Sequence, residues 1–133
     1  ACNGQAKWIW APSVTDESAP AEMAEYYFVT HFSVSKRPAT ALVHLAVDDQ
    51  AEVIVNGTAV GTVGSISDYN LARAAHHEAT TMDIKDALIT GQNTITIHAA
   101  NGTGGFAACE NCAYQQNPAG VVACVDVWYK QSP

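Results

Sequence analysis

Charged side chains are scarce in this sequence of 133 residues, and basic ones are the scarcest. Asp, Glu, Lys and Arg together make up 14% of the chain, against roughly 25% in an average globular protein. Six basic residues face 13 acidic ones, which gives a formal net charge of -7. A surface of this sign repels nucleic-acid phosphates and attracts cations. We therefore expect no nucleic-acid partner.

Long apolar runs are missing as well. A membrane-spanning helix needs about 20 consecutive apolar residues, and every apolar run here is far shorter. The Lys and Arg residues are scattered singly, so no polybasic patch or basic amphipathic helix is available for a membrane surface. We expect no membrane insertion, and the length fits one domain over residues 1–133.

Catalytic signatures are also lacking. The chain has no Gly-x-Ser-x-Gly elbow, no His-Glu-x-x-His motif and no phosphate-binding loop. Glycoside hydrolysis uses two carboxylates roughly 5–9.5 Å apart, whereas Asp48 and Asp49 are adjacent and are expected to face solvent. The other acidic candidates, Glu52, Glu110 and Asp126, fall on separate elements. We expect a protein that is not an enzyme.

Four cysteines are present, at positions 2, 109, 112 and 124. An even number predicts disulfides in an oxidising compartment, with three possible connectivities. Pairing of Cys2 with Cys124, or with one of the two loop cysteines, is favoured, and all four are expected to be oxidised. Because the chain begins with Ala1 followed by Cys2, it is interpreted as a mature secreted protein whose leader has been removed.

The spacing of Cys109 and Cys112 also matches two other kinds of site. A redox dithiol belongs at the start of a helix after a strand, but this pair lies in a glycine-rich loop. A structural zinc site needs a second ligand pair at suitable spacing, and only Cys2 and Cys124 are left. A disulfide that fastens the loop is therefore favoured over both.

Two-residue alternation of apolar and polar side chains dominates the rest of the chain and predicts strands. The expected strands are 8–10, 26–34, 40–47, 52–55, 58–63, 94–100 and 121–129. Asn56-Gly57 between two of them predicts a type I′ hairpin. Residues 64–81 are expected to be irregular, 82–89 to contain a short helical turn, and 101–120 to form a long loop. This pattern predicts an all-β sandwich with antiparallel connections.

An ordered series of motifs resembles a known family over nearly the whole chain. It runs through the segments 8–10 (Trp-Ile-Trp), 46–49 (Ala-Val-Asp-Asp), 53–61 (Val-Ile-Val-Asn-Gly-Thr-Ala-Val-Gly), 91–95 (Gly-Gln-Asn-Thr-Ile) and 118–121 (Pro-Ala-Gly-Val). The series resembles the galactose-binding-domain-like jelly roll beside the catalytic domain of bacterial α-L-rhamnosidases, including their rhamnose-binding module, and similar jelly rolls of fungal secreted lectins. The resemblance implies a non-catalytic carbohydrate-binding domain.

The same resemblance implies a calcium site. In the rhamnose-binding module an Asp-Asn pair before the hairpin coordinates the ion, and Asp48-Asp49 stands there, with a second carboxylate in place of the amide. Asn101 matches a further ligand after the next-to-last strand, and the Asn117-Pro118 region matches a backbone carbonyl ligand. Ca²⁺ takes six to eight oxygen ligands, and vicinal sugar hydroxyls can complete its shell. The sugars expected are rhamnose, galactose or related residues with cis hydroxyls, and a homodimer or partner domain would supply avidity.

Aromatic and histidine residues give further candidates. Phe106 and Tyr114 can stack on a sugar or pack their loop on the sandwich. His76 and His77 are expected to be exposed loop residues, because neighbours on an extended chain point to opposite faces. The histidines expected in strands, at 31, 44 and 98, are predicted to be cross-strand polar partners, and the tryptophans at 8, 10 and 128 to be mostly core, although one of them can serve as a sugar platform.

Two questions remain open, namely an alternative function and the occupancy of two glycosylation sequons. A structural or protein-interaction domain of a larger secreted protein fits the same fold, since fold alone does not fix function. The sequons at Asn56 and Asn101 are glycosylation acceptors in a eukaryotic secretory pathway, and a glycan on Asn101 would obstruct the expected site.

Overall fold

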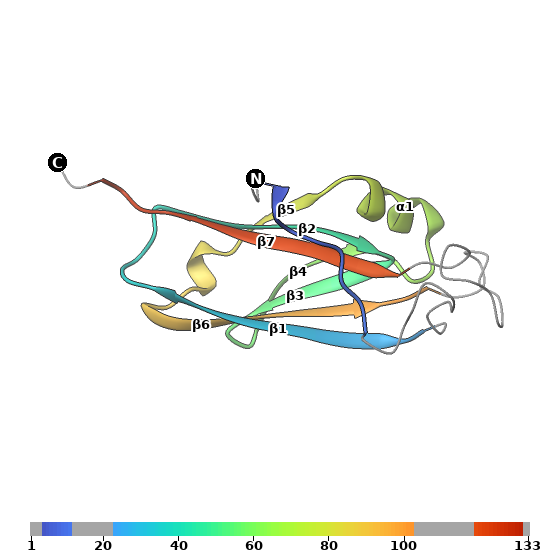
Figure 1. The fold of residues 1–133 in the computed structure, drawn as a ribbon, viewed down its shortest axis with the longest axis horizontal. Coiled ribbons are helices and arrows are strands. Elements are labelled where there is room, and N and C mark those ends of the chain that lie inside the picture. The colour runs from blue at the N-terminus through green and yellow to red at the C-terminus, as the bar shows by residue number, and fades with distance from the viewer. Residues whose placement is uncertain (1–3, 12–22, 103–118, 132–133) are drawn as a thin grey trace.

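Two antiparallel sheets lie face to face in the computed structural model, which describes residues 4–11, 23–102 and 119–131 (Figure 1). One sheet has the strand order β1 (Glu25–Val34), β6 (Gly91–Ala100), β3 (Gln50–Val55) and β4 (Thr58–Gly64). The other has the order β5 (Thr80–Asp83), β2 (Thr40–Asp48) and β7 (Gly120–Trp128). Every paired strand runs antiparallel to its neighbour. The prediction of an all-β sandwich is confirmed.

The core lies between the sheets and follows the alternation seen in the sequence. Every second residue of the inner strands points inward, and its side chain is excluded from water. The buried cluster includes Val43, Leu45, Val47, Val53, Val55, Ile95, Ile97 and Val121. Each large apolar side chain buried in this way stabilises the fold by about 1.5–3 kcal/mol. The apolar pattern therefore fixes which face of each strand is inside.

The hairpin between β3 and β4 has the predicted form. Val55 pairs with Thr58, so Asn56 and Gly57 are the two loop residues. Their φ angles are 50° and 82°, and positive φ at both positions defines a type I′ turn. This prediction is confirmed.

The segment expected to be irregular, 64–81, instead contains the helix α1 (Tyr69–His77). The Asp68 side chain caps it by accepting hydrogen bonds from the backbone N–H groups of Asn70 and Leu71, at 2.9 and 3.2 Å. Ala72 and Ala75, one turn apart, are buried where the helix packs against β2 and β4. The expectation of an irregular segment was wrong, because Asp68 caps a helix whose buried side is formed by two small residues, Ala72 and Ala75.

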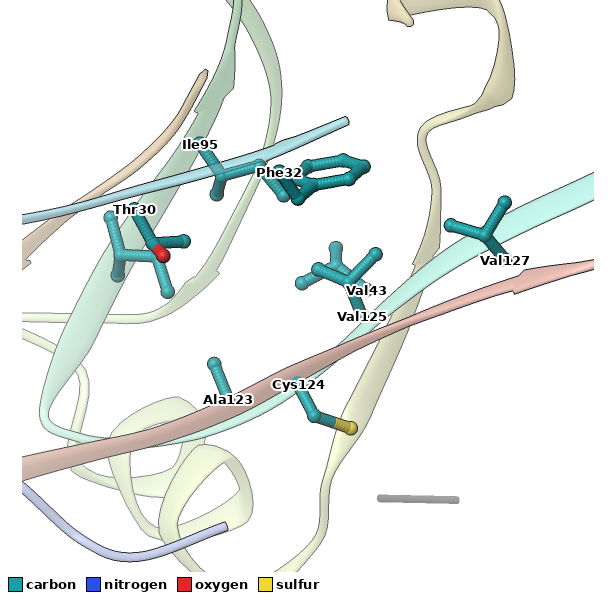
Figure 2. Close-up of a pocket in the computed structure, with 9 residues that line it drawn as sticks. Thr30, Phe32, Val43, Ile95, Ala123, Cys124, Val125 and Val127 are labelled. Atoms are coloured by element: carbon teal, nitrogen blue, oxygen red, sulfur yellow. The ribbon is translucent and has the colours of Figure 1, made fainter. Parts of the chain in front are cut away.

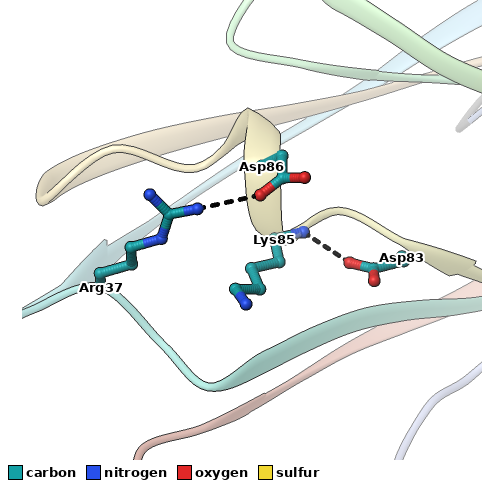
Figure 3. Close-up of polar contacts among 4 residues, drawn as sticks. All are labelled: Arg37, Asp83, Lys85 and Asp86. Atoms are coloured by element: carbon teal, nitrogen blue, oxygen red, sulfur yellow. Dashed lines mark hydrogen bonds and ion pairs between the residues drawn. The ribbon is translucent and has the colours of Figure 1, made fainter.

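The region 82–89 is only partly helical. Met82 and Asp83 belong to β5 and pair with β2, and the helical turn is the 3-10 helix η2 (Lys85–Ala87). Figure 3 shows two polar contacts of this turn: Asp83 Oδ1 accepts from the Lys85 N–H at 2.9 Å, and Arg37 Nη2 donates to Asp86 Oδ1 at 3.1 Å. Both members of the Arg37–Asp86 pair are exposed, so this pair contributes little to stability.

The strand expected at 8–10 is reduced to a single bridge, in which Ile9 pairs with Val121 of β7. Trp10 packs against the core and against the rings of Tyr26 and Phe28, as expected. Trp8 and Trp128 are 49% and 50% exposed, so a core role is wrong for these two. No helix within the described ranges has the length and apolar character to cross a membrane.

Candidate functional site

The two adjacent aspartates lie at one end of the sandwich, on the right in Figure 1, where β2 and β6 end and β7 begins. Asp48 is the last residue of β2 and pairs with Gly120. The Asp49 N–H donates to the Ala100 carbonyl at 3.2 Å, and the Gly102 N–H donates to Asp49 Oδ2 at 2.6 Å. The antiparallel sheet thus brings Asn101 beside Asp49.

The site residues at this end of the sandwich are more buried than the sequence analysis predicts. Asp49 is 7% exposed and Asn101 is fully buried, while 13% of the Asp48 side chain is exposed. The expectation that the aspartates face solvent is therefore wrong. The chain at 101–102 covers Asp49 from one side, and Ser65, whose N–H donates to the Asp49 carbonyl at 3.2 Å, covers it from another.

The two carboxyl groups share a hydrogen bond, and their protonation is perturbed. Burial raises the pKa of Asp48 above its usual range, partly offset by the hydrogen bond to Asp49. Burial, reinforced by the hydrogen bond and the negative charge of Asp48, raises the pKa of Asp49 to about 7, against the lowering effects of the Gly102 N–H and His76. Two buried carboxylates in contact repel each other when both are ionised. In the absence of a cation, the state in which the two carboxyl groups together carry one proton is therefore favoured.

His76 joins this pair and was missed as a site residue. Its Nδ1 lies 3.0 Å from Asp48 Oδ2, and its ring centroid lies 5.7 Å from that of Trp8. His76 and His77 are both exposed, as expected, but the expectation of an extended loop was wrong, because both belong to α1 and their rings lie 5.1 Å apart. In the sequence, Asp68 before an alanine-rich stretch was the signal that could have indicated the helix α1, and with it the position of His76.

The strand histidines have the cross-strand partners that were predicted. His31 Nδ1 lies 2.9 Å from Thr94 Oγ1, and His44 Nδ1 lies 2.8 Å from Thr81 Oγ1. The His98 ring stacks on Tyr27 with 4.3 Å between centroids. These contacts confirm structural cross-strand pairing.

The donor set at the aspartate end suits a hard cation. Two carboxylates and one amide offer oxygen atoms, which Ca²⁺ prefers. Among the described residues, no group of three or more His, Cys, Asp or Glu side chains is arranged to hold a metal. Any further ligands must therefore include groups of other kinds or segments elsewhere in the chain. Of the expected site residues, Phe106, Tyr114, Asn117 and Pro118 lie outside the described residues.

A hollow opens between the two sheets, and neither aspartate lines it. Its volume is about 350 Å³, and its walls come from β1, β6, β2 and β7. Figure 2 shows Phe32 and Ile95 facing Val43 and Val125 across it, with the Cys124 sulfur pointing away. Its lining contains no carboxylate, amide or histidine side chain. Apart from the hydroxyl of Thr30, it therefore offers none of the polar side chains that orient a sugar.

Cys124 is the one cysteine within the described part of the chain, and it is disulfide-bonded. The oxidation of all four cysteines and their connectivity stay predictions, because Cys2, Cys109 and Cys112 lie outside the described residues.

Comparisons with known proteins identify the fold. No protein-family model matches the chain, and no curated protein matches it by sequence. Among solved structures, an α-L-rhamnosidase of Streptomyces avermitilis, determined in complex with L-rhamnose, superposes with a TM-score of 0.66 at 20% identity over 90% of this chain and 10% of its own. A Dictyoglomus thermophilum α-L-rhamnosidase gives 0.65 at 21% identity over 95% and 15%, and a Bacillus sp. GL1 rhamnosidase of family GH78 gives 0.63 at 21% over 92% and 12%.

The chain spans only 10–15% of the length of these enzymes. The likeness confirms the fold that the sequence resemblance implied, a β-sandwich domain shared with α-L-rhamnosidases.

Proposed function

We propose that this chain is a secreted, non-catalytic domain that binds carbohydrate through a calcium ion held by Asp48, Asp49 and Asn101. The observation that carries the proposal is the contact between two buried carboxylates, Asp48 and Asp49, directly beside a fully buried Asn101. Burying like charges together is costly unless a proton or a cation compensates them. A cation with oxygen preference meets that need.

The likeness to α-L-rhamnosidases supports a carbohydrate ligand, because one of the similar enzymes was determined with L-rhamnose. A bound Ca²⁺ can exchange two waters for vicinal hydroxyls, so sugars with cis hydroxyls, such as rhamnose and galactose, are the favoured ligands over glucose. The backbone carbonyl of Pro118 and the side chains of Phe106, Tyr114 and Asn117 remain proposed contributors.

A binding role is favoured over hydrolysis by the geometry of the same pair. Retaining and inverting glycosidases hold their carboxyl groups roughly 5–9.5 Å apart, with substrate or water between them. Asp48 and Asp49 are instead close enough to share a hydrogen bond. They leave no such gap for a glycosidic bond.

A glycan array probed with and without a chelator tests this function. We expect binding to rhamnose- or galactose-terminated glycans in calcium, lost on chelation. Chelator-resistant binding would refute the calcium role. Absence of any glycan binding would favour the structural or protein-interaction alternative.

A further inference from the structure

Trp8 is a large aromatic side chain left half in solvent, 49% exposed, beside the aspartate end. Its position is fixed by the next residue, because Ile9 and Val121 exchange two backbone hydrogen bonds of 2.9 and 3.0 Å. Val121 is the second residue of β7 and pairs with Val47, the residue before Asp48. The exposed indole is therefore anchored close to the proposed calcium ligands.

A chain of contacts joins Trp8 to the carboxylate. The Trp8 and His76 rings lie 5.7 Å apart with their planes tilted by 44°, and His76 Nδ1 lies 3.0 Å from Asp48 Oδ2. His76 comes from the last turn of α1. Three elements, the N-terminal segment, α1 and β2, thus place an aromatic ring, an imidazole and a carboxylate in one row.

This row offers the two kinds of contact that a pyranose needs. One face of a pyranose consists of C–H groups and packs on an aromatic ring, while its hydroxyls bond to polar or charged groups. A Trp ring provides a wide apolar surface with few rotamers to fix. About half of the apolar surface of the Trp8 side chain stays in contact with water. A bound sugar would remove part of this surface from water, which is favourable.

We infer that Trp8 is the stacking platform for the sugar, with His76 joining it to Asp48, one of the proposed calcium ligands. This inference rests on the proposed function and adds a binding residue that lies more than 90 residues, in sequence, from the candidate aromatics Phe106 and Tyr114. The ligand class is a pyranose that presents an apolar face to Trp8 and a vicinal diol to the ion.

The test compares Trp8→Ala with Trp128→Ala. Trp128 is equally exposed, but it pairs with Thr40 at the far end of β2, so it serves as a matched control. Two readouts are needed, namely the affinity for L-rhamnose by titration calorimetry in calcium and the rise in unfolding temperature on adding calcium. Trp8→Ala should weaken rhamnose binding about tenfold, which corresponds to about 1.4 kcal/mol, and keep the calcium-induced rise. Trp128→Ala should match the wild type in both.

Trp8→Phe keeps an aromatic face and should retain binding within about threefold, which guards against a folding defect in the alanine variant. If the wild type binds rhamnose in calcium and Trp8→Ala binds it equally well, the platform is refuted while the proposed function stands. If the wild type shows neither a calcium-induced rise nor rhamnose binding, the proposed function itself is refuted.

Discussion

At the scale of single residues, Asp49 is the most informative, because it couples the site to pH. Its pKa is raised to about 7 in the folded protein, mainly by burial, whereas an Asp in an unfolded chain titrates near 3.8. Between these values the folded state holds a proton that the unfolded state has released. By linkage, the stability of calcium-free protein falls as pH rises through this window.

We predict that calcium-free protein loses roughly 3 kcal/mol of unfolding free energy between pH 4 and pH 7 through this group. Denaturant melts at several pH values in chelator measure it. Asp49→Asn should remove most of the decline, whereas the exposed Asp86→Asn should leave it unchanged. An identical pH profile for wild type and Asp49→Asn would contradict the shifted titration.

Asn93 is the second residue with a defined role, at the opposite end of the sandwich. It is 1% exposed, and its Oδ1 accepts from the Ile89 N–H and from Asn56 Nδ2, both at 2.8 Å. Its Nδ2 donates to the carbonyls of Ile89 and Gly91 at 2.8 and 3.0 Å. One amide therefore satisfies four groups that would otherwise lack a partner at the entry to β6.

Asn93→Ala should lower the unfolding free energy by about 2–3 kcal/mol, because it leaves buried polar groups without partners. Chemical denaturation measures the loss, with the exposed neighbour Gln92→Ala as the control. A loss below about 0.5 kcal/mol would show that water replaces the amide. Calcium and sugar binding should persist in this variant, since Asn93 lies far from the aspartates.

At the scale of elements, most strands were predictable because more and less buried residues alternate along much of their length, as in β3 and β6, whereas β5 was not expected. The Asn56-Gly57 turn was predictable because a type I′ turn demands positive φ twice. The helix α1 was not recognised, because it is short and the residues that it buries, Ala72 and Ala75, are small. Its Asp68 cap was the one local signal, and missing it also hid the role of His76.

Gly64, the last residue of β4, lies against the backbone of Asp49. Its φ is +78°, and a Cβ at this position would fall 1.9 Å from the Asp49 carbonyl oxygen. Gly57 has a similar φ of +82° with nothing within 4 Å. An alanine at position 57 would therefore meet backbone strain alone, whereas an alanine at position 64 would meet the same strain and also a steric clash with Asp49.

Gly57→Ala should cost about 1–2 kcal/mol through strain alone. Gly64→Ala should cost at least about 2 kcal/mol more and should weaken calcium binding, because the Asp49 backbone must move. Thermal unfolding with and without calcium tests both variants. Equal destabilisation by the two substitutions would contradict the close approach of Gly64 to Asp49.

At the scale of the whole molecule, the fold could be predicted and the site only in part. Alternation along the strands fixed the sandwich, and the ordered motifs fixed its likeness to the rhamnosidase domains. The meeting of Asp49 with Asn101 and Gly102 depends on pairing between β3 and β6, residues some 50 positions apart. Burial of the aspartates and the contacts of Trp8 and His76 arise from tertiary packing between segments that lie far apart in the sequence.

The central claim, that calcium joins the aspartates to a sugar, is tested most directly by calorimetry. L-rhamnose is titrated into wild-type protein and Asp48→Ala, each in millimolar calcium and in chelator. We predict weak binding by the wild type in calcium alone, and none by Asp48→Ala in either condition, with the variant still folded through its core. Unchanged rhamnose affinity in Asp48→Ala, or in chelator, would contradict the account.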